Sequence, residues 1–136
     1  MIIYLDENLP PSLAKGFDIL QSPQNFKLNK KIEVKSISDE FGRGCLDEEW
    51  IPLAGKNESC IITQDYNLKR IAHQKELCDK FGLGMIYLRP PSKTGYSYWE
   101  MVGVLHKNWD EICKIVLSQK RPFAYEIRTR SGIKRL

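Results

Sequence analysis

Ile2-Ile3-Tyr4-Leu5-Asp6-Glu7-Asn8 opens the chain as a short apolar run that stops abruptly at three polar residues. An apolar run of this length without polar alternation is typical of a strand covered on both faces of a parallel sheet. Pro10 and Pro11 follow, and proline is tolerated in the first turn of a helix because the N–H groups there have no partner. The stretch therefore predicts a buried strand that leads directly into a helix.

Strand patterns and helix patterns continue to alternate along the chain. We expect further strands over 32–37, 59–63 and 85–88, and an edge strand or extended arm over 122–130. We expect a helix after Pro10, a short helix that starts near Glu48 and continues past Pro52, and a helix over about 66–81. A long helix over about 99–116 completes the pattern, and polar residues 21–31 suggest a loop. Alternating strands and helices predict an α/β fold with a parallel sheet between layers of helices.

Helical spacing also predicts which residues of each helix face inward. The expected inward residues are Leu9, Leu13, Phe17 and Leu20 in the first helix, Leu68, Ile71, Ala72 and Leu77 in the helix over 66–81, and Trp99, Val102, Leu105, Trp109, Ile112 and Val116 in the long helix. Trp50 is expected in the core as well. His73 and His106 have no second imidazole at ligand spacing, so we interpret them as solvated or core histidines.

Size and composition place limits on the class of protein. The chain has 136 residues, of which 42% are hydrophobic and 28% charged, as in a single soluble domain. No apolar run approaches the roughly 20 residues needed to cross a bilayer, and the N-terminus lacks a signal peptide, so we expect a cytoplasmic protein. The four cysteines lack a Cys-x-x-Cys pair and are expected to be buried free thiols.

Three acidic residues each follow a short apolar run: Asp6, Asp47 in Gly44-Cys45-Leu46-Asp47-Glu48-Glu49, and Asp65 in Cys60-Ile61-Ile62-Thr63-Gln64-Asp65. In an open α/β sheet, ligands gather outside the carboxyl ends of the strands. A single Asp there is usually a helix cap or a turn residue, and Asp47 and Asp65 both fit that role. Together, however, the three fit a site for a hard cation that serves phosphodiester hydrolysis.

Positive charge is concentrated near the end of the chain. The formal net charge is +4, and the segment 120–136 contains Lys120, Arg121, Arg128, Arg130, Lys134 and Arg135. Such a segment beside an acidic site suits a polyanion that is held by its phosphates. A solvated basic tail is an equally good interpretation.

The three acidic stretches together resemble a known family. Leu5-Asp6-Glu7-Asn8-Leu9-Pro10, Gly44-x-x-Asp47-Glu48-Glu49-Trp50 and Ile62-Thr63-Gln64-Asp65 are similar to the PIN-like domain of VapC-type toxins, over Met1 to about Leu88. The resemblance implies a Rossmann-like three-layer sandwich, Mg²⁺ or Mn²⁺ as cofactor, cleavage of RNA, and an antitoxin protein that blocks the site.

Transferred by position, the resemblance makes Asp6, Asp47 and Asp65 the metal-binding acids. Many such domains carry a fourth acid two residues after the third, and here that position is Asn67. Asn67 and Glu48 are therefore secondary candidates for the metal, and Glu7, Asn8 or Glu76 could also compensate. Arg121, Arg128, Arg130, Lys134 and Arg135 would grip the RNA backbone. Tyr66 could stack a base, although packing is the safer interpretation.

The leading hypothesis is a magnesium-dependent endoribonuclease, the toxin of a toxin–antitoxin pair. A catalytically degenerate PIN-like module that binds RNA or a protein partner is the alternative, and Asn67 favours it. A receiver-like phosphoacceptor ranks third, because the strand 85–88 is followed by Arg89-Pro90-Pro91 where a receiver needs a lysine. The sequence is also compatible with a homodimer.

Overall fold

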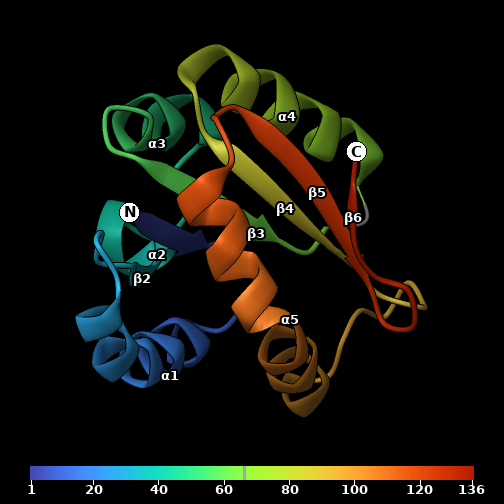
Figure 1. Cartoon of the computed structure of the whole chain (residues 1–136). Coiled ribbons are helices and arrows are strands. Elements are labelled where there is room, and N and C mark those ends of the chain that lie inside the picture. Colours follow the sequence, from blue (N-terminus) through green and yellow to red (C-terminus); the bar gives the residue numbers. More distant parts are fainter. Residues whose placement is uncertain (66) are drawn as a thin grey trace.

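A six-stranded sheet forms the centre of the computed structural model, which describes residues 1–65 and 67–136 (Figure 1). The strand order is β2-β1-β3-β4-β5-β6, and all neighbours are parallel except β5 and β6. The elements are β1 (Ile2–Leu5), α1 (Pro11–Gln21), the 3₁₀ helix η1 (Ser22–Lys27), β2 (Glu33–Ser36), α2 (Ile37–Phe41), α3 (Asp47–Ala54), β3 (Ser59–Thr63), α4 (Leu68–Phe81), β4 (Gly84–Arg89), α5 (Tyr98–Ser118), β5 (Phe123–Arg128) and β6 (Gly132–Arg135).

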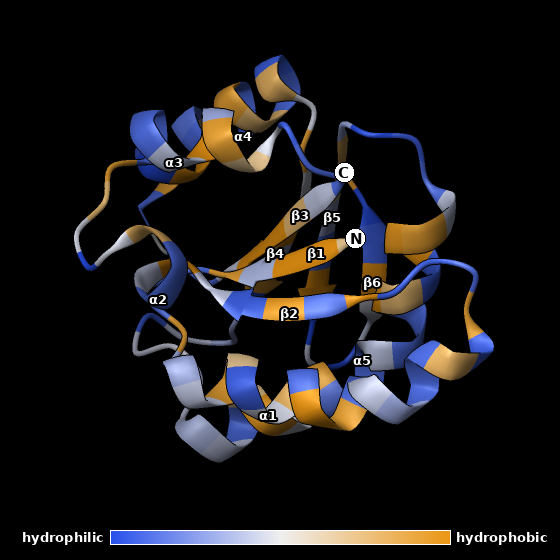
Figure 2. Cartoon of the chain, turned by 90° about the vertical axis from the view of Figure 1, so that its left-hand side faces the viewer, coloured by the Kyte–Doolittle hydropathy of each residue, from blue (hydrophilic) through white to orange (hydrophobic). Residues whose placement is uncertain are grey.

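The sheet separates two layers of helices, as expected for a three-layer sandwich. On one face, α1 and α5 pack against alternate strand residues such as Ile3, Ile62 and Ile86. On the other face, α2, α3 and α4 pack against Tyr4 and Ile61. β1 and β3 are buried on both faces, whereas β2 at the sheet edge is mostly polar and alternates partly exposed with buried positions (Figure 2). The prediction of an α/β fold with a mostly parallel sheet is therefore confirmed.

The order of the strands reverses at β1. The chain passes from β1 to β2 on one side and then returns to place β3 on the other side. The helix that follows β1 covers one face of the sheet, and the helix that follows β3 covers the opposite face. The loops after β1 and β3 therefore diverge, and a crevice between such loops is where open α/β sheets bind ligands.

Several expected elements differ from the observed ones. The strand expected within 122–130 is present as β5, but its expected position at the edge is wrong, because β5 lies between β4 and β6 and the edge is formed by β6. The 21–31 stretch includes η1 rather than being only a loop, since its backbone N–H groups bond within the turn after Pro23. Ile37 does not extend β2 but begins α2, which the sequence pattern did not indicate.

Four residues expected to face inward are exposed instead: Leu20, Leu68, Ala72 and Trp99. In α1 the inward place is taken by Gln21, whose Oε1 accepts a hydrogen bond of 2.9 Å from the indole of Trp109. In α4 the buried residues are Gln74 and Cys78, so the face of this helix that meets the core differs from the expected one. Trp99 lies in the first turn of α5, whose buried positions begin at Met101. Trp50 is buried as expected.

The cysteines are free thiols, and Cys60 and Cys78 are fully buried, as predicted. Burial raises the pKa of Cys78 to about 12. Cys45 and Cys113 are only half-buried. Within the described part of the chain, no helix combines the length and hydropathy that a membrane span requires.

Candidate active site

Asp6 directly continues β1 at the carboxyl edge of the sheet. Its backbone N–H donates to the carbonyl of Ile62 at 3.0 Å, which extends the pairing of β1 with β3 by one residue. Its carboxylate is 1% exposed. Oδ1 accepts from the backbone N–H of Glu7 at 2.9 Å, and Oδ2 accepts from the Thr63 hydroxyl at 2.7 Å. The side chain is therefore held in one orientation beside the end of β3.

Asp65 lies two residues beyond β3. Its Oδ1 accepts from the backbone N–H of Asn67 at 2.9 Å, and its carbonyl accepts from the Tyr87 hydroxyl at 2.5 Å. Asn8 exchanges hydrogen bonds with the backbone of the preceding residue, Gln64. These contacts join the loops after β1 and β3, so Asp65 lies next to Asp6 at the same edge.

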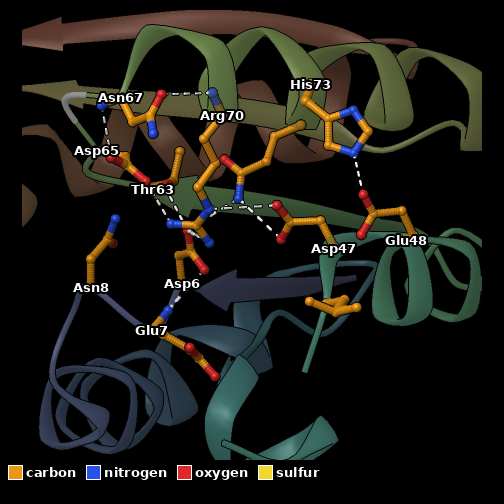
Figure 3. Close-up of polar contacts among 12 residues, drawn as sticks. Asp6, Glu7, Asn8, Asp47, Glu48, Thr63, Asp65, Asn67, Arg70 and His73 are labelled. Carbon is orange, nitrogen blue, oxygen red and sulfur yellow. Dashed lines mark hydrogen bonds and ion pairs between the residues drawn. The ribbon is translucent and has the colours of Figure 1, made fainter. Parts of the chain in front are cut away.

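Asp47 comes from a different layer, at the first residue of α3. An acid in the first turn of a helix is favoured by the helix dipole. The loop before it is anchored to the β1 loop because the backbone N–H of Gly44 donates to Glu7 Oε1 at 2.6 Å. Asp47 Oδ1 accepts from the indole N–H of buried Trp50 at 3.0 Å. The carboxylate is thereby directed toward Asp6 (Figure 3).

Arg70, from the first turn of α4, brings the three acids together. Its Nη1 lies 2.5 Å from Asp65 Oδ2, its Nη2 3.5 Å from Asp6 Oδ2, and its Nε 3.6 Å from Asp47 Oδ2 (Figure 3). Burial alone would lower the pKa of Arg70, but the three carboxylates outweigh that effect and raise it. A permanently charged guanidinium therefore occupies the centre of the acidic cluster.

Gln74 lies one turn further along α4 and contacts two acids of the cluster from the buried side. It is fully buried, and its Nε2 donates to Asp6 Oδ2 at 3.2 Å and to Asp47 Oδ1 at 3.3 Å. Its Oε1 is buried and has no hydrogen-bond partner among the described residues. A buried carbonyl oxygen without a partner is costly. The site therefore contains one oxygen that a ligand could satisfy.

The chemistry of this donor set fits a divalent cation such as Mg²⁺ or Mn²⁺. Carboxylate and amide oxygens are the ligands that such hard ions prefer. In the described part of the chain, however, no three acidic, histidine or cysteine side chains already lie in a geometry that could hold an ion. The carboxylates of Asp6, Asp47 and Asp65 instead contact the guanidinium of Arg70.

A pocket of about 320 Å³ opens beside the cluster, lined by Glu7, Gly44, Cys45, Leu46, Asp47, Glu48 and Arg70. It connects solvent with the side of the cluster formed by Asp47 and Arg70. Of the three acids, Asp47 lines this pocket, so the pocket provides a route from solvent to Asp47 and Arg70.

The two secondary metal candidates have other partners. Glu48 Oε1 lies 2.5 Å from Nε2 of His73, so the pair links α3 to α4 at the surface. Asn67 is the N-cap of α4, where its Oδ1 accepts from the backbone N–H groups of Lys69 and Arg70 at 3.1 and 3.2 Å. The cap of this helix is therefore Asn67 and not Asp65. Tyr66 lies outside the described residues.

The basic residues of the C-terminal segment divide between the two edges of the sheet. Arg128 ends β5 and Arg130 follows it, so both lie at the carboxyl edge with the acids. Arg121 precedes β5 and contacts Glu58 at 3.4 Å, at the amino edge. Lys134 and Arg135 run back along β6, opposite Glu126 and Tyr125. Among the basic residues that the sequence interpretation proposed for RNA binding, Arg128 and Arg130 are therefore the two at the same edge as Asp6.

Three polar residues of the cluster were missed by the sequence interpretation: Thr63, Arg70 and Gln74. Thr63 is part of the Thr-x-Asp motif, and its place as the last residue of a strand next to β1 could have indicated the contact with Asp6. Arg70 and Gln74 are four residues apart and so share one face of a helix. The sequence pattern instead assigned the inward face to Leu68, Ile71, Ala72 and Leu77, of which Ile71 and Leu77 pack against the core and Leu68 and Ala72 are exposed.

Neither the curated proteins nor the solved structures contain a match to this chain. A family model does match: that of the PIN-like domain, over residues 1–90, which include β1 to β4 and all the residues of the acidic cluster. The match spans about two thirds of the 136 residues. The chain therefore belongs to the PIN-like domain family.

Proposed function

We propose that this protein is a metal-dependent ribonuclease whose site is formed by Asp6, Asp47 and Asp65. The observation that carries the proposal is the convergence of three carboxylates, from the residue after β1, from α3 and from the loop after β3, on the guanidinium of Arg70 at the carboxyl edge. Holding three negative charges together is unfavourable unless a cation compensates them. Family membership supports a nuclease as the class of activity.

The residues of the site have separate roles in this proposal. Asp6, Asp47 and Asp65 would hold Mg²⁺ or Mn²⁺, and Thr63 and Gln74 would orient Asp6. When bound, such a cation supplies positive charge at the scissile phosphate and makes a water molecule more acidic. Arg70, released from the carboxylates, would remain beside the site and could pair with a phosphate oxygen of the substrate. No side-chain nucleophile is required.

Replacement of Asp65 by Asn tests the proposal. The expected result is loss of cleavage of a labelled single-stranded RNA in Mn²⁺ or Mg²⁺, with an unchanged thermal unfolding midpoint. Asp79→Asn is the matched control, because Asp79 is a surface acid of α4 paired with Lys75 at 3.0 Å. If Asp65→Asn and Asp6→Asn both cut RNA at the rate of the unchanged protein, the proposal is wrong.

Arg70 favours a second candidate function, a PIN-like module that binds RNA or a protein without cutting. In that case the guanidinium permanently replaces the metal. Calorimetric titration with Mn²⁺ discriminates between the two: absence of binding at millimolar metal supports the binding module. The antitoxin partner and a role as a toxin are further predictions of the resemblance, and co-purification of the chain with a neighbouring gene product would test them.

A further inference from the structure

A second charged cluster lies at the carboxyl edge of the sheet, two strands away from the acids. Arg89 ends β4 and Arg128 ends β5, and the two residues are paired in the parallel register. Arg130 follows in the turn between β5 and β6. With Pro90, Pro91 and Thr129, these arginines line a pocket of about 610 Å³.

A buried acid fixes the arginines in place. Glu126 is 6% exposed, and its two oxygens are divided between Arg89 (Oε2 to Nη1, 3.3 Å) and Arg128 (Oε1 to Nε, 3.0 Å). The side chains of Arg89 and Arg128 are nonetheless 46% and 52% exposed. One carboxylate compensates one of three guanidinium charges, so the pocket keeps a positive charge and unused donors that face solvent.

The turn that carries Arg130 is attached to the end of β4. The hydroxyl of buried Tyr96 donates to the carbonyl of Arg89 at 3.2 Å and lies 2.9 Å from the Thr129 hydroxyl. The arginines therefore belong to a preorganised surface, which lowers the cost of ordering them around a ligand.

The two clusters are arranged along one edge in a fixed order. The acids follow β1 and β3, and the arginines end β4 and β5 (Figure 1). Adjacent strands are about 4.8 Å apart, so the centres of the two clusters are separated by two spacings, about 10 Å. This distance is longer than one nucleotide step, so a single strand that lies along the edge with one phosphate at the acids can place another phosphate at the arginines.

We propose that Arg89, Arg128 and Arg130 form a subsite for a backbone phosphate of RNA, more than one nucleotide away from the phosphate placed at the acids. The inference rests on the proposed function for its substrate class. Arg128 and Arg130 lie beyond residue 90, where the family match ends. The subsite is thus an addition by the C-terminal part of the chain to the site of the PIN-like domain.

The test uses the double variant Arg128→Ala/Arg130→Ala, which leaves Arg89 to compensate the buried Glu126. Binding of fluorescein-labelled oligouridylates of two and eight nucleotides is measured by anisotropy in EDTA, which prevents cutting. We expect the Kd of the eight-nucleotide probe to rise at least tenfold and the Kd of the two-nucleotide probe to stay unchanged. The slope of log K against log salt should fall by about 0.7, the value expected for the loss of one phosphate contact on a single strand.

The matched control is Lys107→Ala/Lys114→Ala, which removes two exposed positive charges from α5. The subsite proposal is overturned if the double arginine variant binds the long probe as tightly as the unchanged protein, or if the lysine control weakens binding equally. The proposed function fails separately: if the unchanged protein does not cut RNA in Mn²⁺ or Mg²⁺, or if Asp6→Asn and Asp65→Asn both cut at its rate, the nuclease site among the acids is wrong. Length-dependent binding that is lost in the arginine variant still supports the phosphate subsite in that case.

Discussion

The guanidinium of Arg70 lies 2.5 Å from the carboxylate of Asp65, and the same guanidinium also contacts the other two acids of the cluster. The carboxylates therefore have a cation in this structure, and it is part of the chain. A divalent ion bound among these acids, as proposed above, would have to compete with it. The proposed function therefore predicts that Arg70 lowers the affinity for metal while it stabilises the fold.

Replacement of Arg70 by Ala should raise the affinity for Mn²⁺ by at least tenfold, measured by calorimetry. Without metal, the variant should lose stability, because three carboxylates remain close together without a partner. Removal of one partner of a buried pair costs about 3–5 kcal/mol, and partial exposure of Arg70 reduces this to about 2 kcal/mol. Saturating Mn²⁺ should restore the free energy of unfolding.

The matched control for Arg70 is Lys69→Ala, which removes an exposed positive charge from the neighbouring position of the same helix. It should change neither metal affinity nor stability by a measurable amount. If Arg70→Ala binds Mn²⁺ no more tightly than the unchanged protein, Arg70 does not compete with the metal.

Replacement of Gln74 by Leu should destabilise the protein by about 2 kcal/mol in chemical denaturation. The substitution removes the donor shared by Asp6 and Asp47 and leaves both carboxylates less satisfied in a buried place. Gln24→Leu, at an exposed position of η1, should stay within about 0.5 kcal/mol. Equal stability of the two variants would mean that the Gln74 amide contributes nothing to the cluster.

The sequence was sufficient to predict the central strands because their residues are apolar without interruption. Burial on both faces leaves no other place for Ile2 to Leu5 or for Ile61 and Ile62. β6 was not predicted, because Gly132-Ile133-Lys134-Arg135 has a single apolar residue and its strand is defined by pairing with β5. Edge strands of this kind depend on a neighbour that the local sequence does not reveal.

The proximity of Asp6 and Asp65 could be predicted from the sequence because each follows a strand, and neighbouring parallel strands end at the same edge of a sheet. Arg70 could not be found in this way. Its position depends on how α4 packs over the sheet. The buried residues of α4 include a polar one, Gln74, beside Cys78, and a pattern of apolar residues does not identify it. Helix patterns identify core residues by hydropathy and therefore fail where a site inserts polar side chains.

Thr63 should act as a positioning residue for Asp6. Its hydroxyl is buried at the end of β3 and donates to Asp6 Oδ2 at 2.7 Å. Replacement by Val, which keeps the shape, should lower Mn²⁺ affinity by about 10- to 100-fold, as for other groups that orient metal ligands. Thr63→Ser should restore affinity because it restores the donor. If Ser and Val behave alike in calorimetry, the effect arises from packing and not from the hydrogen bond.

The contact between Glu48 and His73 should make stability depend on pH. The backbone N–H at the start of α3, followed by His73, holds the pKa of Glu48 below its ordinary value of 4.5. A depressed carboxyl pKa stabilises the fold above the unfolded pKa, and this contribution is lost as pH falls through the folded pKa. Thermal unfolding between pH 6 and pH 3 should therefore show a smaller decline for Glu48→Gln than for the unchanged protein.

The matched control for this pH effect is Glu76→Gln, an exposed acid of α4. It should leave the pH dependence of the unfolding midpoint as it is. His73→Gln should reduce the decline only in part, since the backbone contribution at the helix start remains. A decline in Glu48→Gln as steep as in the unchanged protein would show that Glu48 is equally stabilised in the folded and unfolded chains.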